Sequence, residues 1–122
     1  MCKIALIVDD ETELVEMLHD GLKIVGISSL TAGNPKDAIN IIDNDKTNIS
    51  IVITDIYMKD GTGLEIIEHI RSTNLKDRLP VYVMSAGPPN KLSQETTDLM
   101  TGYIEKPFNV DDIVELIERI IE

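Results

Sequence analysis

Polar residues that could do chemistry follow four of the five apolar runs in this sequence. Asp9 and Asp10 come after the first run, Asp55 after the third, Ser85 closes the fourth, and Lys106 follows the fifth. Carboxylates are the ligands that a hard cation such as Mg²⁺ prefers, and a lysine adds a compact positive charge. Taken singly, each residue has a plainer explanation, because Asp caps helices and turns, and serine or Lys-Pro is common in loops.

The three carboxylates would destabilise a fold that gathered them without a cation. Two like charges about 4 Å apart repel by roughly 4 kcal/mol at an effective dielectric near 20. A divalent ion held by a few carboxylates, a carbonyl oxygen and waters relieves that repulsion, and Mg²⁺ suits such a site best. If these acids converge, the sequence therefore predicts Mg²⁺ as the cofactor and Lys106 as a second positive charge.

Short apolar runs alternate with longer amphipathic segments along the chain. The runs predict strands at 3–8, 28–32, 49–54, 80–85 and 102–105, and the segments between them predict helices at 11–25, 34–43, 63–72, 89–100 and 109–122. This alternation predicts an α/β fold, with a parallel sheet covered by helices on both faces. The carboxyl ends of parallel strands share one edge of the sheet, which is where such folds bind ligands.

Helix signals support several of these assignments. Asn34 and Asn109 are expected to cap the second and fifth helices, and Pro35 suits a first helical position. The segment 89–100 is the weakest helix, because Pro88 and Pro89 stand at its start and Thr96 and Thr97 are adjacent within it. In the first helix the apolar stripe is expected to be Leu14, Leu18, Leu22 and Val25.

Size and charge narrow the classes of function. With 122 residues the chain is expected to form one domain, and no apolar stretch approaches the ~20 residues of a membrane span. The lone Cys2 and the lack of a signal peptide predict a cytoplasmic protein without membrane attachment. The net charge of −11 argues against direct nucleic-acid binding and favours a divalent cation or basic partner surfaces.

Four motifs together resemble the receiver domain of two-component response regulators, as in the chemotaxis receivers. They are LIVDDE, ITDIYMKDGTGLEII, VYVMSA and GYIEKPF, in the family's order and spacing over essentially the whole chain. The resemblance implies a receiver domain over residues 1–122. It also implies a doubly wound, flavodoxin-like five-stranded sheet of order 2-1-3-4-5. The implied function is to accept a phosphoryl group and switch a protein-interaction face.

The resemblance also implies a role for each matching residue at the phosphorylation site. Asp55 is the expected phosphoacceptor, and Asp10 and Asp55 the expected direct ligands of Mg²⁺. Asp9 would act on the ion through water, and the backbone carbonyl of Tyr57 would complete the protein ligands. Lys106 would bind a phosphoryl oxygen.

Other residues match the switch of the family. Ser85 would bond the phosphoryl group, Tyr103 would change rotamer with it, and the Lys106–Pro107 peptide would be cis. The implied donor is a histidine kinase or a phosphotransfer protein. The implied target is a downstream protein or a fused output domain, and the final helical pattern is compatible with either arrangement.

The sequence departs from the common receiver pattern around the phosphoacceptor. Lys59 replaces a proline and Thr62 an aspartate, and neither position has a chemical role in the family. Tyr57 is bulky for a position beside the path of the attacking water, so Tyr57 and Gly87 are expected to tune dephosphorylation. Tyr57 and the proline-containing loop AGPPNK also leave open a receiver fold that docks to partners without phosphorylation.

Rival interpretations have less support. A flavodoxin needs a Ser/Thr/Gly-rich phosphate loop where this chain has DDETE, and the Asp-dependent phosphatases need an aspartate at the position of Tyr57. His19 and His69 lie on predicted helices away from the strand ends, so we expect packing or surface roles for them. The methionines are expected to fill gaps in the core rather than to bind metal; they are Met58, Met84 and Met100.

Overall fold

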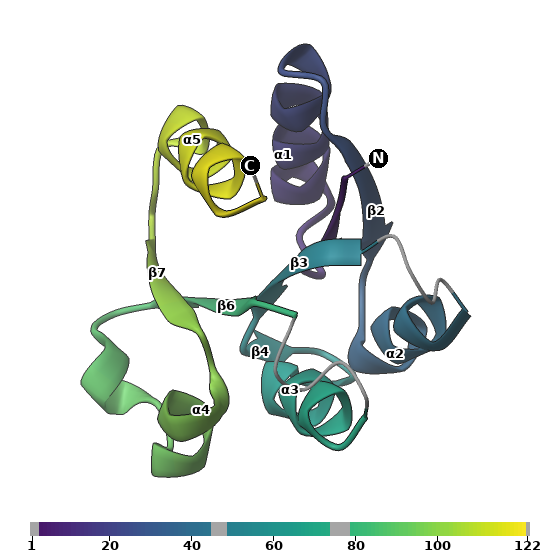
Figure 1. The fold of residues 1–122 in the computed structure, drawn as a ribbon. Helices are drawn as coiled ribbons and strands as arrows, with labels where there is room; N and C mark the ends of the chain where they lie inside the picture. The colour runs from purple at the N-terminus through teal and green to yellow at the C-terminus, as the bar shows by residue number, and fades with distance from the viewer. Residues whose placement is uncertain (1–2, 45–48, 74–78, 122) are drawn as a thin grey trace.

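The computed structural model describes residues 3–44, 49–73 and 79–121, so Cys2 and Glu122 lie outside the described residues. At its centre is a five-stranded parallel sheet of order β2-β1-β3-β6-β7 (Figure 1). The strands are β1 (Ile4–Val8), β2 (Ser28–Ala32), β3 (Ile49–Asp55), β6 (Val81–Ala86) and β7 (Gly102–Lys106). Counted within the sheet, this is the predicted order 2-1-3-4-5, and the predicted flavodoxin-like α/β fold is confirmed.

Helices cover both faces of the sheet (Figure 1). One face carries α1 (Thr12–Ile24) and α5 (Val110–Ile121), and the other carries α2 (Pro35–Asn44), α3 (Gly63–Arg71) and the short α4 (Gln94–Leu99). Each face has its own apolar core, and the central strands β1 and β3 contribute alternate side chains to both. Burial on both faces explains why these strands are nearly continuous apolar runs.

Predicted caps hold the starts of two helices. The Asn34 side chain accepts a hydrogen bond from the Asp37 N–H at 2.8 Å, and the Asn109 side chain accepts one from the Asp111 N–H at 2.8 Å. Each bond satisfies a backbone donor that has no partner within its helix. These caps determine where α2 and α5 begin, just beyond the strand edge that holds the acids.

The structure differs from the sequence predictions in two elements. The predicted helix at 89–100 is divided into a 3₁₀ turn (η1, Pro89–Lys91) and α4, because Leu92 and Ser93 have extended backbones and Ser93 starts a new helix as its N-cap. A hairpin that the sequence did not predict, β4 (Tyr57–Met58) paired with β5 (Gly61–Thr62), follows β3.

The buried face of α1 also differs from its prediction. Val25 was expected to join the apolar stripe but is 40% exposed, whereas Val15 is buried. The reason is that α1 ends at Ile24, so Val25 is its C-cap and leaves the helical register. Among the described helices, none combines the length and apolar character needed to cross a membrane.

Candidate functional site

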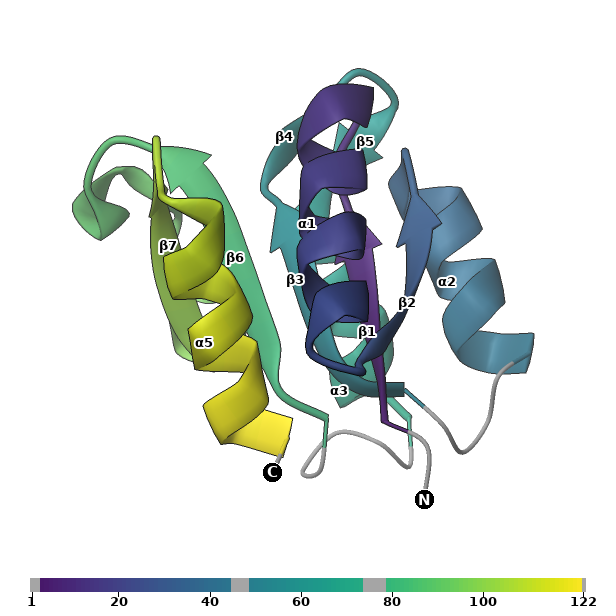
Figure 2. The ribbon, with the colours of Figure 1, turned by 90° about the horizontal axis from the view of Figure 1, so that it is seen from above.

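The strand register brings the polar strand ends together. Val8 lies opposite Thr54, Asp55 opposite Met84, and Ala86 opposite Lys106. The polar residues at or just beyond these pairs share the carboxyl edge of the sheet, the edge toward which the arrowheads point in Figure 2. The turn before α1 and the β4–β5 hairpin lie at this edge as well (Figure 2).

The backbone around Asp55 is tightly packed. The Thr54 hydroxyl donates to the Asp55 carbonyl at 2.9 Å, and the Gly63 N–H donates to the Ile56 carbonyl at 2.9 Å. A Cβ atom on Gly63 would lie 2.5 Å from the Asp55 carbonyl oxygen, so only glycine fits where α3 begins. The start of α3 therefore fixes the backbone that carries the expected phosphoacceptor.

The Lys106 ammonium bridges three carboxylates. Its Nζ atom lies 2.8 Å from Asp9 Oδ2, 3.2 Å from Glu11 Oε1 and 3.4 Å from Asp55 Oδ2. Asp9 and Asp55 are buried, with 2% and 8% of their surfaces exposed, while the Glu11 side chain is 65% exposed. The Lys106 ammonium, at the end of β7, thus links acids at the ends of β1 and β3, as the convergence of acids requires.

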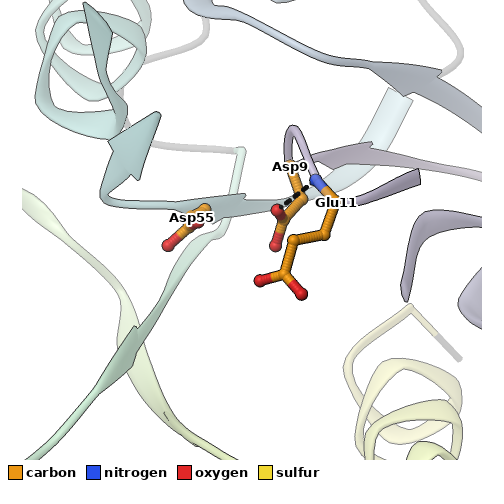
Figure 3. Close-up of side chains that lie close together, drawn as sticks. All are labelled: Asp9, Glu11 and Asp55. Carbon is orange, nitrogen blue, oxygen red and sulfur yellow. Dashed lines mark hydrogen bonds between the residues drawn. The ribbon is translucent and has the colours of Figure 1, made fainter. Parts of the chain in front are cut away.

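The group of acids differs in one member from the sequence prediction. Oxygen atoms of Asp9, Glu11 and Asp55 lie within 4.8 Å of one another (Figure 3). Sequence reasoning missed Glu11, although its place two residues after Asp9 in the DDETE run was an available signal. Asp10 is not in this group; its exposed carboxylate accepts a hydrogen bond from the Lys59 N–H at 3.0 Å. Direct ligation of Mg²⁺ by Asp10 stays a prediction.

The ionisable groups of the site perturb one another. Burial raises the pKa of Asp55 above its usual value, the Asp9 charge raises it further, and Lys106 offsets part of the rise. Burial alone would lower the pKa of Lys106, but the hydrogen bond to Asp9 and the charges of Asp55 and Asp9 outweigh it, so the pKa of Lys106 is raised. Lys106 therefore stays charged, and the Asp55 carboxylate lies where added positive charge stabilises it.

The expected switch residues lie beside this edge. Ser85 is buried, and its hydroxyl donates a long bond, 3.4 Å, to the Ala86 carbonyl. The Tyr103 hydroxyl donates to the Ser85 carbonyl at 3.2 Å and to the Gly87 carbonyl. The Lys106–Pro107 peptide bond is cis, the geometry expected from the sequence. The serine, the tyrosine and the loop after β6 are thus in direct contact.

A largely apolar pocket opens beside Lys106. It has a volume of about 380 Å³ and is lined by Glu11, Leu14, Ala86, Lys106, Pro107 and Phe108. The charged site therefore has an apolar surface beside it, between the starts of α1 and α5.

Tyr57 follows β3, and 65% of its surface is exposed.

The histidines and methionines that the sequence assigned to packing or surface roles make contacts outside the acidic group. His19 hydrogen-bonds to Ser29, and the His69 imidazole lies 2.7 Å from the Asp43 carboxylate. Met84 is fully buried, and Met58 and Met100 pack against the core beneath α2 and α3. Within the described residues, neither histidine belongs to a group of side chains that could hold a metal.

A comparison with protein families identifies the chain. The family described as the response regulator receiver domain matches residues 5–118. The chain belongs to this family. Receiver domains are parts of two-component systems, in which they interact with histidine kinases and output domains, and they are generally not enzymes in the ordinary sense.

Two curated relatives show how far the similarity of this receiver extends. The probable transcriptional regulatory protein TcrX of Mycobacterium tuberculosis is 30% identical over 112 residues, which cover 89% of this chain and 45% of TcrX. The response regulator MprA of Mycolicibacterium vanbaalenii is 29% identical over 119 residues, 95% of this chain and 49% of MprA. The receiver thus spans about half the length of these two relatives.

Solved structures share the fold. The chemotaxis protein CheY4 of Vibrio cholerae superposes with a TM-score of 0.85 at 24% identity, covering 98% of this receiver and 99% of CheY4. The response regulator TrrA of Thermotoga maritima, solved in complex with Mg²⁺ and BeF, has a TM-score of 0.81 at 27% identity, covering 97% of this receiver and 98% of TrrA.

The acidic pocket of this receiver has the donor chemistry of a magnesium site. Mg²⁺ prefers carboxylate and carbonyl oxygens, keeps several of its waters, and needs only one or two direct carboxylates. Asp9, Glu11 and Asp55 provide oxygens within 4.8 Å of one another, two of them on buried residues. These residues could hold a divalent metal ion.

Proposed function

We propose that this receiver accepts a phosphoryl group on Asp55 in a Mg²⁺-dependent reaction and then switches a protein-interaction surface. The whole chain, residues 1–122, would act as one receiver domain. The observation that carries the proposal is the contact of the Lys106 ammonium with both Asp9 and Asp55, at 2.8 and 3.4 Å. Phosphoryl transfer needs a carboxylate nucleophile with a cation beside it, and Asp55 and Lys106 are such a pair.

The transfer step follows from the positions of these groups. An oxygen of Asp55 attacks phosphorus, and the P–N bond of a phosphohistidine donor breaks as the O–P bond forms. The bonding electrons leave with the imidazole, which takes up a proton from solvent. Lys106 donates a hydrogen bond to a phosphoryl oxygen while keeping its bond to Asp9. Mg²⁺ at the acidic pocket, when bound, supplies charge that offsets the transferring oxygens.

The switch follows from the contacts of Ser85 and Tyr103. A phosphoryl group on Asp55 brings about −1.5 to −2 charges and strong hydrogen-bond acceptors to the strand edge. The Ser85 hydroxyl, which donates a long bond to the Ala86 carbonyl, would turn to the phosphoryl group. Because the Tyr103 hydroxyl bonds to the Ser85 and Gly87 carbonyls, a shift of this backbone would move Tyr103 and the loop before α4.

The proposed partners are a histidine kinase or a phosphotransfer protein as donor and a downstream protein or fused output domain as target. The apolar pocket lined by Leu14, Pro107 and Phe108 beside Lys106 offers contact surface to a donor protein. Tyr57 lies two residues after Asp55 and Gly87 two residues after Ser85, and we propose that they adjust how fast water removes the phosphoryl group.

The test is the intact mass of the protein after incubation with acetyl phosphate and Mg²⁺. The proposal expects one added phosphoryl group that is absent without metal and absent in Asp55→Asn. Asp20→Asn, an exposed aspartate on α1, is the matched control and should be modified like the wild type. Phosphoramidate and rapid quenching guard against a short-lived adduct.

A protein that gains no phosphoryl group would favour the second candidate function, a receiver fold that docks to partners without phosphorylation. The observation in its favour is the exposure of Tyr57, which places a large aromatic side chain on the surface after β3. If no donor gives an adduct and Asp55→Asn binds partners as the wild type does, this candidate replaces the first.

A further inference from the structure

We propose that β2, a strand at the edge of the sheet, pairs antiparallel with β2 of a second copy of this chain, with a two-fold axis at Leu30. The pairing joins the two sheets into one. The inference goes beyond the proposed function and does not depend on phosphorylation, because β2 and the switch strand β7 form opposite edges of the sheet (Figure 2).

The outer side of β2 carries backbone hydrogen-bonding groups. The Asp9 N–H donates to the Ala32 carbonyl at 3.1 Å, so the backbone of Ala32 faces β1. Successive residues of a strand direct their backbone groups to opposite sides, so Leu30 also faces β1, whereas Ser29 and Thr31 face outward. Of the strands that the structure describes, only β1 pairs with β2. The outward N–H and C=O groups are therefore available to another strand.

Open space runs along this side of β2. A groove of about 430 Å³ takes in Ser29, Leu30 and Thr31, with His19 of α1 and Ile41 of α2 beside them. A second groove, of about 390 Å³, also lies beside Ser29 and His19. A hydrogen bond joins the His19 imidazole to the Ser29 hydroxyl on the α1 side, and Leu30, on the other face, is 36% exposed. A strand laid along β2 therefore has room and meets an exposed apolar side chain.

The strand β2 lacks the features that protect an exposed edge from pairing. Natural proteins protect such edges with charged side chains, prolines, β-bulges or a covering segment. The β2 sequence, SSLTA, has no charge and no proline, and its register with β1 is continuous. The opposite edge strand, β7, carries Glu105 and Lys106. Of the two edges, β2 is therefore the one suited to accept a further strand.

The residues of β2 are complementary to themselves. A two-fold axis at Leu30 sets Ser29 opposite the partner's Thr31, and Thr31 opposite the partner's Ser29. Because both residues face outward, each pair exchanges N–H···O bonds in both directions. Leu30 lies opposite the partner's Leu30 in the closer, non-hydrogen-bonded type of pair, where the two side chains touch. Hydroxyl residues thus face hydroxyl residues, and the exposed leucine becomes buried.

The distribution of charge selects this edge for contact between identical chains. In a two-fold contact, each residue near the axis lies close to its own copy, so a charged residue there meets its own sign. The chain has a net charge of −11, yet β2 is uncharged. Apart from His19, the ionisable residues lining the two grooves are Glu16 and Lys23, which have opposite signs. Two copies therefore meet at β2 without the repulsion that an acidic surface causes.

The experiment is sedimentation velocity of the protein from micromolar to millimolar concentration, without a phosphoryl donor or Mg²⁺. The wild type should shift from monomer to dimer. Leu30→Lys should raise the Kd of the dimer about tenfold, because two lysines replace the leucine contact on the axis. Met17→Lys is the matched control, since Met17 is an exposed apolar residue of α1 outside both grooves. It makes the same change of charge and should dimerise as the wild type does.

A second measurement does not depend on how the variants fold. Amide hydrogen exchange of Ser29 and Thr31 in the wild type should slow as concentration rises, because these N–H groups gain partners in the dimer. The N–H of Leu30, which faces β1, should change little. Thr31→Pro removes one outward donor and spares the ladder with β1, so it should also weaken the dimer.

A wild type that stays monomeric at millimolar concentration overturns the proposal and leaves this edge to a strand of another protein. A dimer that Leu30→Lys and Thr31→Pro form as readily as Met17→Lys overturns it too, because the contact then lies elsewhere. A dimer weakened in both β2 variants and kept in Met17→Lys supports the proposal. None of these results bears on the phosphorylation of Asp55.

Discussion

The Lys106 ammonium lies 2.8 Å from Oδ2 of Asp9, a carboxylate with no exposed side-chain surface. This contact joins the end of β7 to the end of β1, 97 residues apart in sequence. A buried carboxylate is stable only when charged partners or hydrogen bonds replace its water. The same lysine that would bind a phosphoryl oxygen therefore also holds the fold together at its functional edge.

We expect Lys106→Met to destabilise the metal-free protein at pH 7 by roughly 3 kcal/mol, the lower end of the cost of breaking a buried ion pair. The cause is that Asp9, Glu11 and Asp55 lose their shared cation. Urea unfolding measures the effect, and the loss should shrink as the pH falls and the Asp55 carboxyl, whose pKa is raised, protonates. Lys59→Met, which removes an exposed lysine, is the control. Equal stability of the two variants would contradict the prediction.

In the absence of metal, Asp55→Asn should raise the melting temperature at pH 7. The folded protein holds the pKa of Asp55 above its usual value of 3.8, mainly through burial. Stability is therefore lost as pH rises through that raised pKa, and a neutral side chain avoids the loss. The gain should vanish as pH falls and the wild-type carboxyl protonates. A gain independent of pH, or one also seen for Asp20→Asn, would argue against this explanation.

Millimolar Mg²⁺ should raise the melting temperature of the wild type. A ligand that binds only the folded state at ten times its Kd adds about 1.4 kcal/mol of stability. Differential scanning calorimetry with MgCl₂, compared with NaCl at equal ionic strength, measures this. Asp55→Asn should respond much less, because it lacks one of the charged oxygens. An equal response to both salts would mean that the acidic group does not bind the ion.

Tyr103→Phe should destabilise the protein by about 1 kcal/mol and loosen the loop after β6. The variant loses the hydrogen bonds of the Tyr103 hydroxyl to the Ser85 and Gly87 carbonyls. Amide hydrogen exchange over residues 87–93 should become faster. Tyr82→Phe is the control, since the Tyr82 hydroxyl makes no hydrogen bond within the described residues. Unchanged exchange in Tyr103→Phe would show that this hydroxyl does not hold the loop.

Arg71→Met should destabilise the protein by about 2 kcal/mol and free the end of α4. The guanidinium donates to the Leu99 carbonyl at 3.0 Å, the Leu79 carbonyl at 3.0 Å and the Thr101 hydroxyl at 3.3 Å. Carbonyl acceptors left without this cationic donor account for the cost. Unfolding of the protein measures the loss of stability, and amide hydrogen exchange of Met100 and Thr101 measures the freedom of the end of α4. Arg119→Met, on the exposed side of α5, should change neither.

The sequence predicted the features that depend on neighbouring residues. Alternating apolar runs predicted the parallel sheet, and the capping residues Asn34 and Asn109 indicated the starts of two helices. The motifs at the strand ends indicated the receiver family, which the family comparison confirmed. These features are readable because hydrogen bonds within a turn and burial of one face repeat over a few residues.

Where sequence prediction failed, distant contacts or competing local bonds decided the structure. The segment 89–100 has enough helical character to predict one helix, but a Ser93 cap and extended residues before it divide the segment in two. Tyr57 pairs with Thr62 in a hairpin that no alternation of apolar and polar residues in the sequence predicts. Two-residue strands are too short to leave such a pattern.

By itself, the sequence determined the fold class, the strand order through its family, and which acids stand at the strand ends. Only the tertiary structure showed that Glu11 joins Asp9 and Asp55 around Lys106 while Asp10 binds the Lys59 N–H. Glu11 and Lys106 are 95 residues apart. Their contact depends on the register of the strands, on where α1 begins and on the rotamers of the two side chains. Residue types specify which charges are present, but the packed sheet decides which of them meet.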